Sequence, residues 1–169
     1  KRYVDVNEGN IHVKSRKGLG TKFTVALPVV VESDDYELPE VAIRADDGHR
    51  PHVLVVEDDH ETQKFLQLIL HAHCQLPFAD TGLQAWAILE KEVIDLILMD
   101  ISLRGDEDGL QLTSRIRENP AYSQLPIIAV TAHAFADDRR RSLEAGCNEY
   151  LPKPFRVKQL REIITRFTT

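Results

Sequence analysis

Polar and charged residues follow several short apolar runs of this sequence. They are the acidic residues Glu57, Asp58, Asp59 and Asp100, the hydroxyl residue Thr131, and the pair Tyr150 and Lys153. Short apolar runs are typical of strands that are buried on both faces of a parallel sheet. Ligands of such sheets bind outside the carboxyl ends of the strands, so we expect these side chains to meet at one edge.

Carboxylates gathered at one edge repel one another unless a cation compensates their charge. Oxygen ligands without His or Cys suit a hard cation, and Mg²⁺ uses one or two carboxylates while it keeps several waters. One carboxylate could then attack phosphorus as a nucleophile, while a hydroxyl and an ammonium group hold the phosphoryl oxygens. The residue types therefore predict Mg²⁺-assisted transfer of a phosphoryl group onto an aspartate.

Each of these residues also has a simpler interpretation. An Asp after a strand is often the N-cap of the next helix, which is the interpretation we favour for Asp59. A Lys before a proline, as Lys153 is, is commonly a solvated loop residue. Because four strand ends agree in their chemistry, we favour the functional interpretation for the set as a whole.

The elements that would position these residues alternate between strand and helix. The apolar runs predict strands at 52–56, near 74–78, and at 95–99, 126–130 and 148–151, and helical spacing predicts helices over 60–72, 81–91, 109–118, 134–145 and 156–167. Asp108 is the expected N-cap of the third helix, and Gly146 is expected to end the fourth. The alternation predicts an α/β fold with a parallel sheet covered on both faces through right-handed crossovers.

Residues 1–50 follow a different pattern. Alternating residues at 10–15 and 22–27 flank a glycine-bearing turn, which predicts a β-hairpin. The acidic stretch 29–50 lacks sustained periodicity and is interpreted as a linker. The sequence has no initiator Met and opens within a pattern, so we expect it to be a piece of a longer protein.

The composition of the 169 residues argues against several classes of function. Lys and Arg total 21 against 27 Asp and Glu, a net charge of −6, which argues against nucleic acid as the main partner. No apolar run approaches the ~20 residues of a membrane span and no signal peptide opens the chain, so we expect no membrane contact by this piece. Cys74 and Cys147 are too few for a disulfide framework and are interpreted as free thiols in the reducing cytoplasm.

Four segments of the sequence resemble the receiver domain of two-component response regulators. They are VLVVEDD at 53–59, LILMD at 96–100, PIIAVTAHA at 126–134 and YLPKPF at 150–155, and the match covers 51–169 in order and spacing. The resemblance implies a flavodoxin-like, doubly wound, five-stranded parallel sheet of order 2-1-3-4-5. It also implies that a histidine-kinase or histidine-phosphotransfer domain donates a phosphoryl group from its phosphohistidine.

The resemblance implies a phosphoacceptor beside a Mg²⁺ site. Asp100 matches the phosphoacceptor and Asp58 matches the direct metal ligand. Glu57 completes the acidic pair, and Ser102 matches the position that offers its backbone carbonyl to the metal. The loop after Asp100 departs from the family, because Arg104 stands at the position of a proline and the loop is one residue longer.

The resemblance also implies a switch that responds to phosphorylation. Thr131 matches the switch hydroxyl and Tyr150 the switch aromatic. Lys153 matches the lysine that binds phosphate, and the Lys153–Pro154 bond is usually cis in the family. The face formed by the fourth helix, fifth strand and fifth helix of the receiver would change shape, and it is a candidate surface for homodimerisation.

Residues 8–28, EGNIHVKSRKGLGTKFTVALP, resemble the terminal hairpin of a histidine-kinase ATP-binding domain. The glycine motif lies at Gly18, Gly20, Thr21 and Phe23. The expected organisation is a remnant of that domain at 1–28, a linker at 29–50 and a receiver at 51–169, as in a hybrid sensor histidine kinase. The nucleotide-binding segments of such a domain are absent from this sequence. We therefore expect no ATP binding and no complete enzyme, with the receiver catalysing only its own phosphoryl transfer.

Two other functions stay open at this point. A stand-alone Mg²⁺-dependent phosphatase with an aspartyl nucleophile would usually need a second aspartate two residues beyond that nucleophile, where Ser102 stands. An interaction module that never turns over phosphate would have the same fold. Incubation with acetyl phosphate and Mg²⁺ separates the three functions by slow stoichiometric labelling, catalytic turnover or no reaction.

Overall fold

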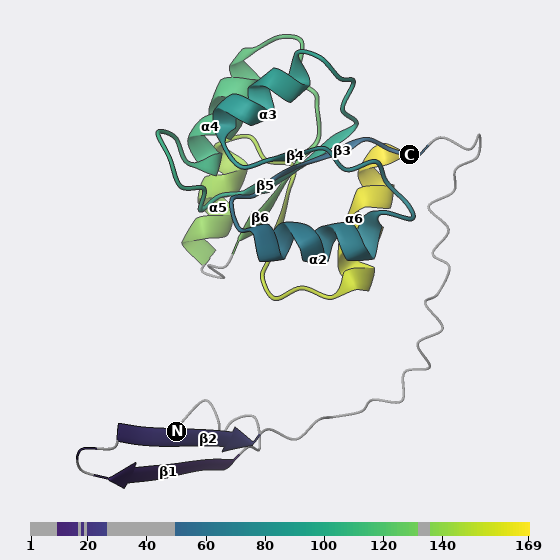
Figure 1. Cartoon of the computed structure of the whole chain (residues 1–169). Coiled ribbons are helices and arrows are strands. Elements are labelled where there is room, and N and C mark those ends of the chain that lie inside the picture. The colour runs from purple at the N-terminus through teal and green to yellow at the C-terminus, as the bar shows by residue number, and fades with distance from the viewer. Residues whose placement is uncertain (1–9, 17, 19, 27–49, 132–135) are drawn as a thin grey trace. The chain divides into compact units, whose positions relative to one another are not determined.

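A computed structural model describes residues 10–16, 18, 20–26, 50–131 and 136–169 of the chain. The chain divides into two compact units, Lys1–Pro39 and Glu40–Thr169, and each unit is described by itself (Figure 1). Residues 1–9, the predicted linker apart from Arg50, and positions 134 and 135 of a predicted helix lie outside the described residues. The predicted domain boundaries stay a prediction.

The first unit contains the predicted hairpin. Strand β1 (Asn10–Arg16) pairs antiparallel with β2 (Gly20–Ala26). Gly18 and Gly20 have φ angles of +82° and +91°, in the left-handed region that glycine adopts without a steric cost. The glycines of the sequence motif therefore allow the tight reversal between the strands.

The second unit is built on a five-stranded parallel sheet. Its strands are β3 (Val53–Val56), β4 (Phe78–Ala79), β5 (Leu96–Asp100), β6 (Ile127–Thr131) and β7 (Glu149–Pro152). The order across the sheet is β4-β3-β5-β6-β7, and every neighbouring pair is parallel. This confirms the predicted order 2-1-3-4-5.

Helices cover both faces of this sheet. They are α2 (His60–Leu70), α3 (Gly82–Leu89), α4 (Gly109–Glu118), α5 (Ala136–Glu144) and α6 (Val157–Thr168). Figure 1 shows α2 and α6 on one face, with α3, α4 and α5 on the other. Asp108 caps α4 in a capping box with Gln111, and Gly146 follows α5 with a φ of +104°, so both predicted helix boundaries are confirmed.

Alternate residues of each strand enter two separate cores. In β3, Leu54 and Val56 join the cluster that α3 and α4 cover, whereas Val53 and Val55 join the cluster beneath α2 and α6. All four are at most 1% exposed. Burial on both faces explains why the central strands appear in the sequence as continuous apolar runs.

The predicted strand near 74–78 is confirmed in part, because the segment pairs with β3 but the regular strand begins late in it. The regular strand β4 covers only residues 78 and 79, and Gln75 forms an isolated bridge to His52. Pro77 has no N–H to donate and interrupts the ladder, although its carbonyl accepts from the Val55 N–H at 2.9 Å. An edge position tolerates this, because only one side of the strand must pair.

Both cysteines are buried free thiols, as predicted. Cys74 lies in the core beneath α2 and α6, and Cys147 lies in the core beneath α3 and α4, so the sheet separates them. Burial raises the pKa of the Cys74 thiol to about 11, which keeps it protonated and unreactive at neutral pH. Among the described helices, none is long and apolar enough to cross a membrane.

Candidate functional site

Three carboxylates meet where the central strands β3 and β5 end. The two strands pair Val56 with Met99, so Glu57, Asp58 and Asp100 emerge side by side. Each offers an oxygen, and these oxygens lie within 4.8 Å of one another. Glu57 and Asp100 are buried at 3% and 7% exposed, whereas the Asp58 side chain is 22% exposed. The all-oxygen donor set fits a hard divalent cation such as Mg²⁺.

Lys153 brings a positive charge from the end of β7 to this cluster. Its Nζ lies 2.5 Å from Glu57 Oε2 and 2.9 Å from Asp100 Oδ2. Burial alone would lower the pKa of the Lys153 ammonium, but its hydrogen bonds to Glu57 and Asp100 outweigh burial and raise that pKa. The Lys153–Pro154 peptide bond is cis, as the resemblance implied. The solvated-loop interpretation of Lys153 is therefore wrong.

Burial has the opposite consequence for Glu57. Desolvation raises the pKa of its carboxyl from the ordinary 4.5 to about 7, opposed by the Lys153 hydrogen bond and reinforced by the charge of Asp100. The Asp59 N–H also donates to Glu57 Oε1 at 3.2 Å. A buried carboxyl that titrates near neutrality is stabilised in its charged form by any further cation bound beside it.

Backbone groups fix the remaining oxygen of Asp100. The Ser102 N–H donates to Asp100 Oδ1 at 2.8 Å, while Lys153 holds Oδ2. Ser102 therefore lies at the site, and the predicted role of its carbonyl toward a metal stays a prediction. Asp59 points elsewhere: it caps α2, and its side chain accepts from the Glu61 N–H and the Thr62 hydroxyl. The N-cap interpretation of Asp59 is confirmed.

Thr131 and Tyr150 lie on the side of the site nearest α5. Thr131 ends β6, is fully buried, and stands one residue beyond Val130, which pairs with Asp100. Tyr150 pairs with Ala129 in the sheet, is half-buried, and packs against the core beneath α3 and α4. Burial raises the pKa of the Tyr150 phenol, and the charge of Asp138 raises it further.

Two side chains that contact the site, Gln63 and Arg104, were not assigned this role from the sequence. Gln63 of α2 donates from Nε2 to the Glu57 carbonyl at 2.5 Å and to Asp80 Oδ1 at 2.6 Å. Asp80 directly follows β4, so its place after a strand was the available signal. Arg104 reaches Asp58, with 3.5 Å between Nε and Oδ2. The sequence marked Arg104 as a departure from the family but gave no partner for it.

The longer loop between β5 and α4 is held at both ends. Leu103 is buried in the core beneath α3 and α4, and Glu107 forms an ion pair with Arg115 at 2.9 Å. The Arg115 guanidinium also stands over the Trp86 ring, 5.0 Å from its centroid. These contacts therefore anchor the loop to α3 and α4.

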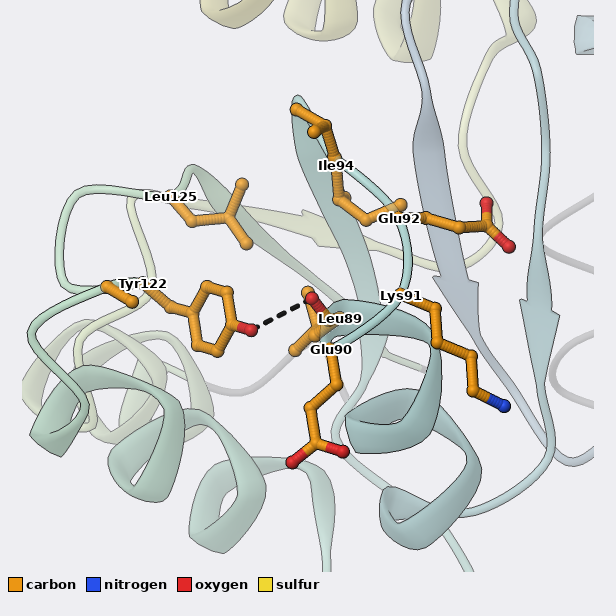
Figure 2. A pocket seen from close by; sticks show the side chains of 9 residues that line it. Leu89, Glu90, Lys91, Glu92, Ile94, Tyr122 and Leu125 are labelled. Carbon is orange, nitrogen blue, oxygen red and sulfur yellow. Dashed lines mark hydrogen bonds between the residues drawn. The ribbon is translucent and has the colours of Figure 1, made fainter.

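A cavity of about 480 Å³ lies at the opposite edge of the sheet. Its lining includes Ile94 and Leu125, which stand just before β5 and β6, and Tyr122, whose hydroxyl donates to the Leu89 carbonyl at 2.8 Å (Figure 2). None of the carboxylates described above lines it. The cavity is separate from the acidic cluster.

Comparison with known proteins identifies the class. Residues 53–165 match the family model of the response regulator receiver domain, and the chain belongs to this family. Its receiver region is homologous to those of hybrid sensor kinases. The sensor protein GacS of Pseudomonas syringae pv. syringae is 35% identical over 136 residues, which cover 75% of this chain and 15% of that protein.

One further relative aligns with nearly the whole chain, and a solved receiver structure has a similar fold. The autoinducer 2 sensor kinase/phosphatase LuxQ of Vibrio parahaemolyticus is 35% identical in an alignment that covers 99% of this chain and 20% of LuxQ. The chain thus spans only a small part of these kinases. The receiver domain of the sensor histidine kinase PA1611 from Pseudomonas aeruginosa, solved with a magnesium ion in its active-site cleft, is 35% identical. It has a TM-score of 0.65, over 71% of this chain and 98% of that one.

Proposed function

We propose that this receiver takes a phosphoryl group from a phosphohistidine onto Asp100, with Mg²⁺, and passes the signal on by a conformational change. The observation that carries the proposal is the position of Lys153, whose Nζ contacts both Glu57 and Asp100 beside the half-buried carboxylate of Asp58. A nucleophile, a metal-binding set and an ammonium group thus share one small site.

The reaction transfers phosphorus from nitrogen to oxygen. A carboxylate oxygen of Asp100 attacks the phosphorus, the phosphorus–nitrogen bond breaks, and the donor imidazole keeps the electron pair and takes up a proton. Glu57, Asp58 and Asp100 would hold Mg²⁺, which neutralises the charge that gathers on the phosphoryl oxygens. Lys153 can donate a charge-assisted hydrogen bond to one of these oxygens, and the Ser102 N–H orients the attacking carboxylate.

The switch follows from the new charge on Asp100. The phosphoryl group brings acceptor oxygens and negative charge, and the Thr131 hydroxyl would donate to one of them. An inward movement of Thr131 would open space beside β6 for Tyr150, which now packs half-buried on the neighbouring strand. The surface of α5, β7 and α6 would change as a result, and it is the surface we propose for output or homodimerisation.

The first unit supports placing this receiver in a hybrid histidine kinase. The hairpin pairs Val13 with Phe23 and Ile11 with Val25, so one of its faces is apolar. Val13, Phe23 and Val25 are all at least half exposed, as expected of strands taken from a larger domain. The alignment with the Vibrio LuxQ also covers 99% of this chain. We propose a kinase-domain remnant at 1–28, a linker at 29–50 and a receiver at 51–169, with a histidine-kinase or histidine-phosphotransfer domain as the partner.

Intact mass spectrometry after incubation with acetyl phosphate tests the central proposal. We expect the wild-type chain to gain the mass of one phosphoryl group in the presence of Mg²⁺ and none in the presence of EDTA. Asp100→Asn keeps the shape of the side chain and should abolish the gain. Asp106→Asn, an exposed acid in the same loop, is the matched control and should label like the wild type.

The other outcomes of this experiment are equally informative. Continuous release of inorganic phosphate at many turnovers per chain would identify a phosphatase. A failure of every form to label would identify an interaction module. Labelling of Asp100→Asn at the wild-type rate would show that another carboxylate is the acceptor.

A further inference from the structure

Arg104 gives the metal-binding edge of this receiver a positive charge of its own. Its Nε lies 3.5 Å from Asp58 Oδ2, the most exposed of the three clustered carboxylates. Lys153 contacts the other two, Glu57 and Asp100. Each carboxylate of the set therefore has a basic side chain beside it.

The neighbours of Arg104 fix the path of its backbone, which keeps the side chain within reach of Asp58. The preceding residue, Leu103, is 7% exposed and belongs to the core beneath α3 and α4. The following residue, Gly105, has a φ of +140°, which favours glycine and turns the chain after Arg104. The Arg104 side chain itself is 93% exposed, so it can approach or leave Asp58 without repacking the core.

A divalent cation and the guanidinium compete for the same carboxylate. Mg²⁺ binds carboxylate oxygens at about 2.1 Å. An ion on Asp58 Oδ2 would therefore lie within about 6 Å of Arg104 Nε in its present position. Two cations at that separation repel each other, so the contact between Arg104 and Asp58 opposes the binding of a metal ion.

We propose that Arg104 is a built-in counter-ion of Asp58 that weakens Mg²⁺ binding to this receiver. The inference rests on the proposed function, in which Asp58 is a metal ligand. Exposed ion pairs contribute little individually, so the expected effect of removing Arg104 is an Mg²⁺ affinity about two- to fivefold higher. With Arg104 in place, a higher Mg²⁺ concentration would be needed to occupy the phosphoryl-transfer site than in a receiver that lacks this arginine.

Mg²⁺ titration of the metal-free chain by calorimetry or NMR measures this affinity without any turnover. Arg104→Gln should bind Mg²⁺ about two- to fivefold more tightly than the wild type, and Arg104→Lys, which keeps the charge, should fall between the two. Lys91→Gln removes one positive charge at the cavity on the opposite edge of the sheet and should leave the affinity unchanged. The gain should shrink as salt is raised, because screening weakens exposed charge pairs.

A double variant isolates the contact itself. In an Asp58→Asn background, Arg104→Gln should raise the affinity for Mg²⁺ by a smaller factor than it does in the wild type. Three results would each overturn the role of Arg104 while leaving the proposed function intact. They are an undiminished gain in the Asp58→Asn background, equal affinities of wild type and Arg104→Gln, and weaker binding by Arg104→Gln. Absence of Mg²⁺ binding in every form would overturn both.

Discussion

The stability of the metal-free receiver should fall as the pH rises toward neutrality because of Glu57. Burial raises the pKa of this carboxyl from 4.5 to about 7, and the residue is only 3% exposed. Between these two pH values the folded chain holds a proton that the unfolded chain has released. The stabilisation is therefore complete below pH 4.5 and is lost as the pH rises through about 7.

The size of the effect follows from the interval between the two pKa values. Each pH unit corresponds to about 1.4 kcal/mol, so the interval gives about 3 kcal/mol as an upper limit. Glu57→Gln removes the titrating group and keeps one oxygen that can accept from the Lys153 ammonium or the Asp59 N–H. The variant should therefore gain stability relative to the wild type as the pH rises from 5 to 8.

Urea unfolding in EDTA, followed through Trp86 fluorescence, measures this difference. Trp86 packs against the core beneath α3 and α4, so it reports on the sheet domain. A change of about 3 kcal/mol moves the urea midpoint by roughly 1–3 M. Glu90→Gln, at an exposed glutamate, controls for the loss of a charge. Parallel pH profiles for wild type and Glu57→Gln would refute the argument, because they would mean that Glu57 ionises without cost in the folded state.

Three further predictions concern the metal, the switch and the loop after the acceptor. Asp58→Asn should weaken Mg²⁺ binding more than Glu57→Gln in a titration, because we expect Asp58 to bind the ion directly and Glu57 to act through a water; equal losses would contradict this ranking. Thr131→Ala should still allow phosphorylation of Asp100, but beryllofluoride should no longer shift the NMR signals of α5 and α6; wild-type shifts in the variant would exclude this hydroxyl from the switch. Gly109→Ala would place a Cβ 2.1 Å from the Asp100 carbonyl oxygen, so it should destabilise the domain by about 1–3 kcal/mol in thermal unfolding; an unchanged Tm would mean that the helix start can shift freely.

The sequence was sufficient for the order of the strands and for the convergence of the acidic residues with Lys153 at one edge of the sheet. Parallel strands bring their carboxyl ends to one edge whatever their side chains, so Asp58, Asp100 and Lys153 could be placed together from the strand pattern alone. The same logic gave Thr131 its position at the end of β6. Local signals were equally direct at Asp108, where the capping box with Gln111 is visible as a spacing of three residues.

The contacts that could not be predicted from the sequence depend on side-chain geometry. The bond from Lys153 to Glu57 as well as to Asp100 requires a particular path of the chain after β7, which no periodicity encodes. The link from Gln63 to Asp80 joins a helix to a neighbouring strand end, and neither residue carries a motif. The late start of the regular strand β4 at Phe78 was not predicted, because it depends on the missing N–H of Pro77, which interrupts the ladder before it.

The charges at the site explain how one cluster of carboxylates can exist both without a metal and with a bound divalent cation. Without a metal, Lys153 and Arg104 stand beside the three carboxylates, and Glu57 can also hold a proton near neutral pH. A divalent cation on Asp58 makes the Arg104 contact unnecessary and favours the ionised form of Glu57. A phosphoryl group on Asp100 then adds negative charge where Lys153 is already held, so its ammonium can exchange one carboxylate for a phosphoryl oxygen without losing a partner. In the proposed reaction, Lys153 would thus limit the repulsion between Glu57 and Asp100 beforehand and stabilise the phosphorylated product afterwards.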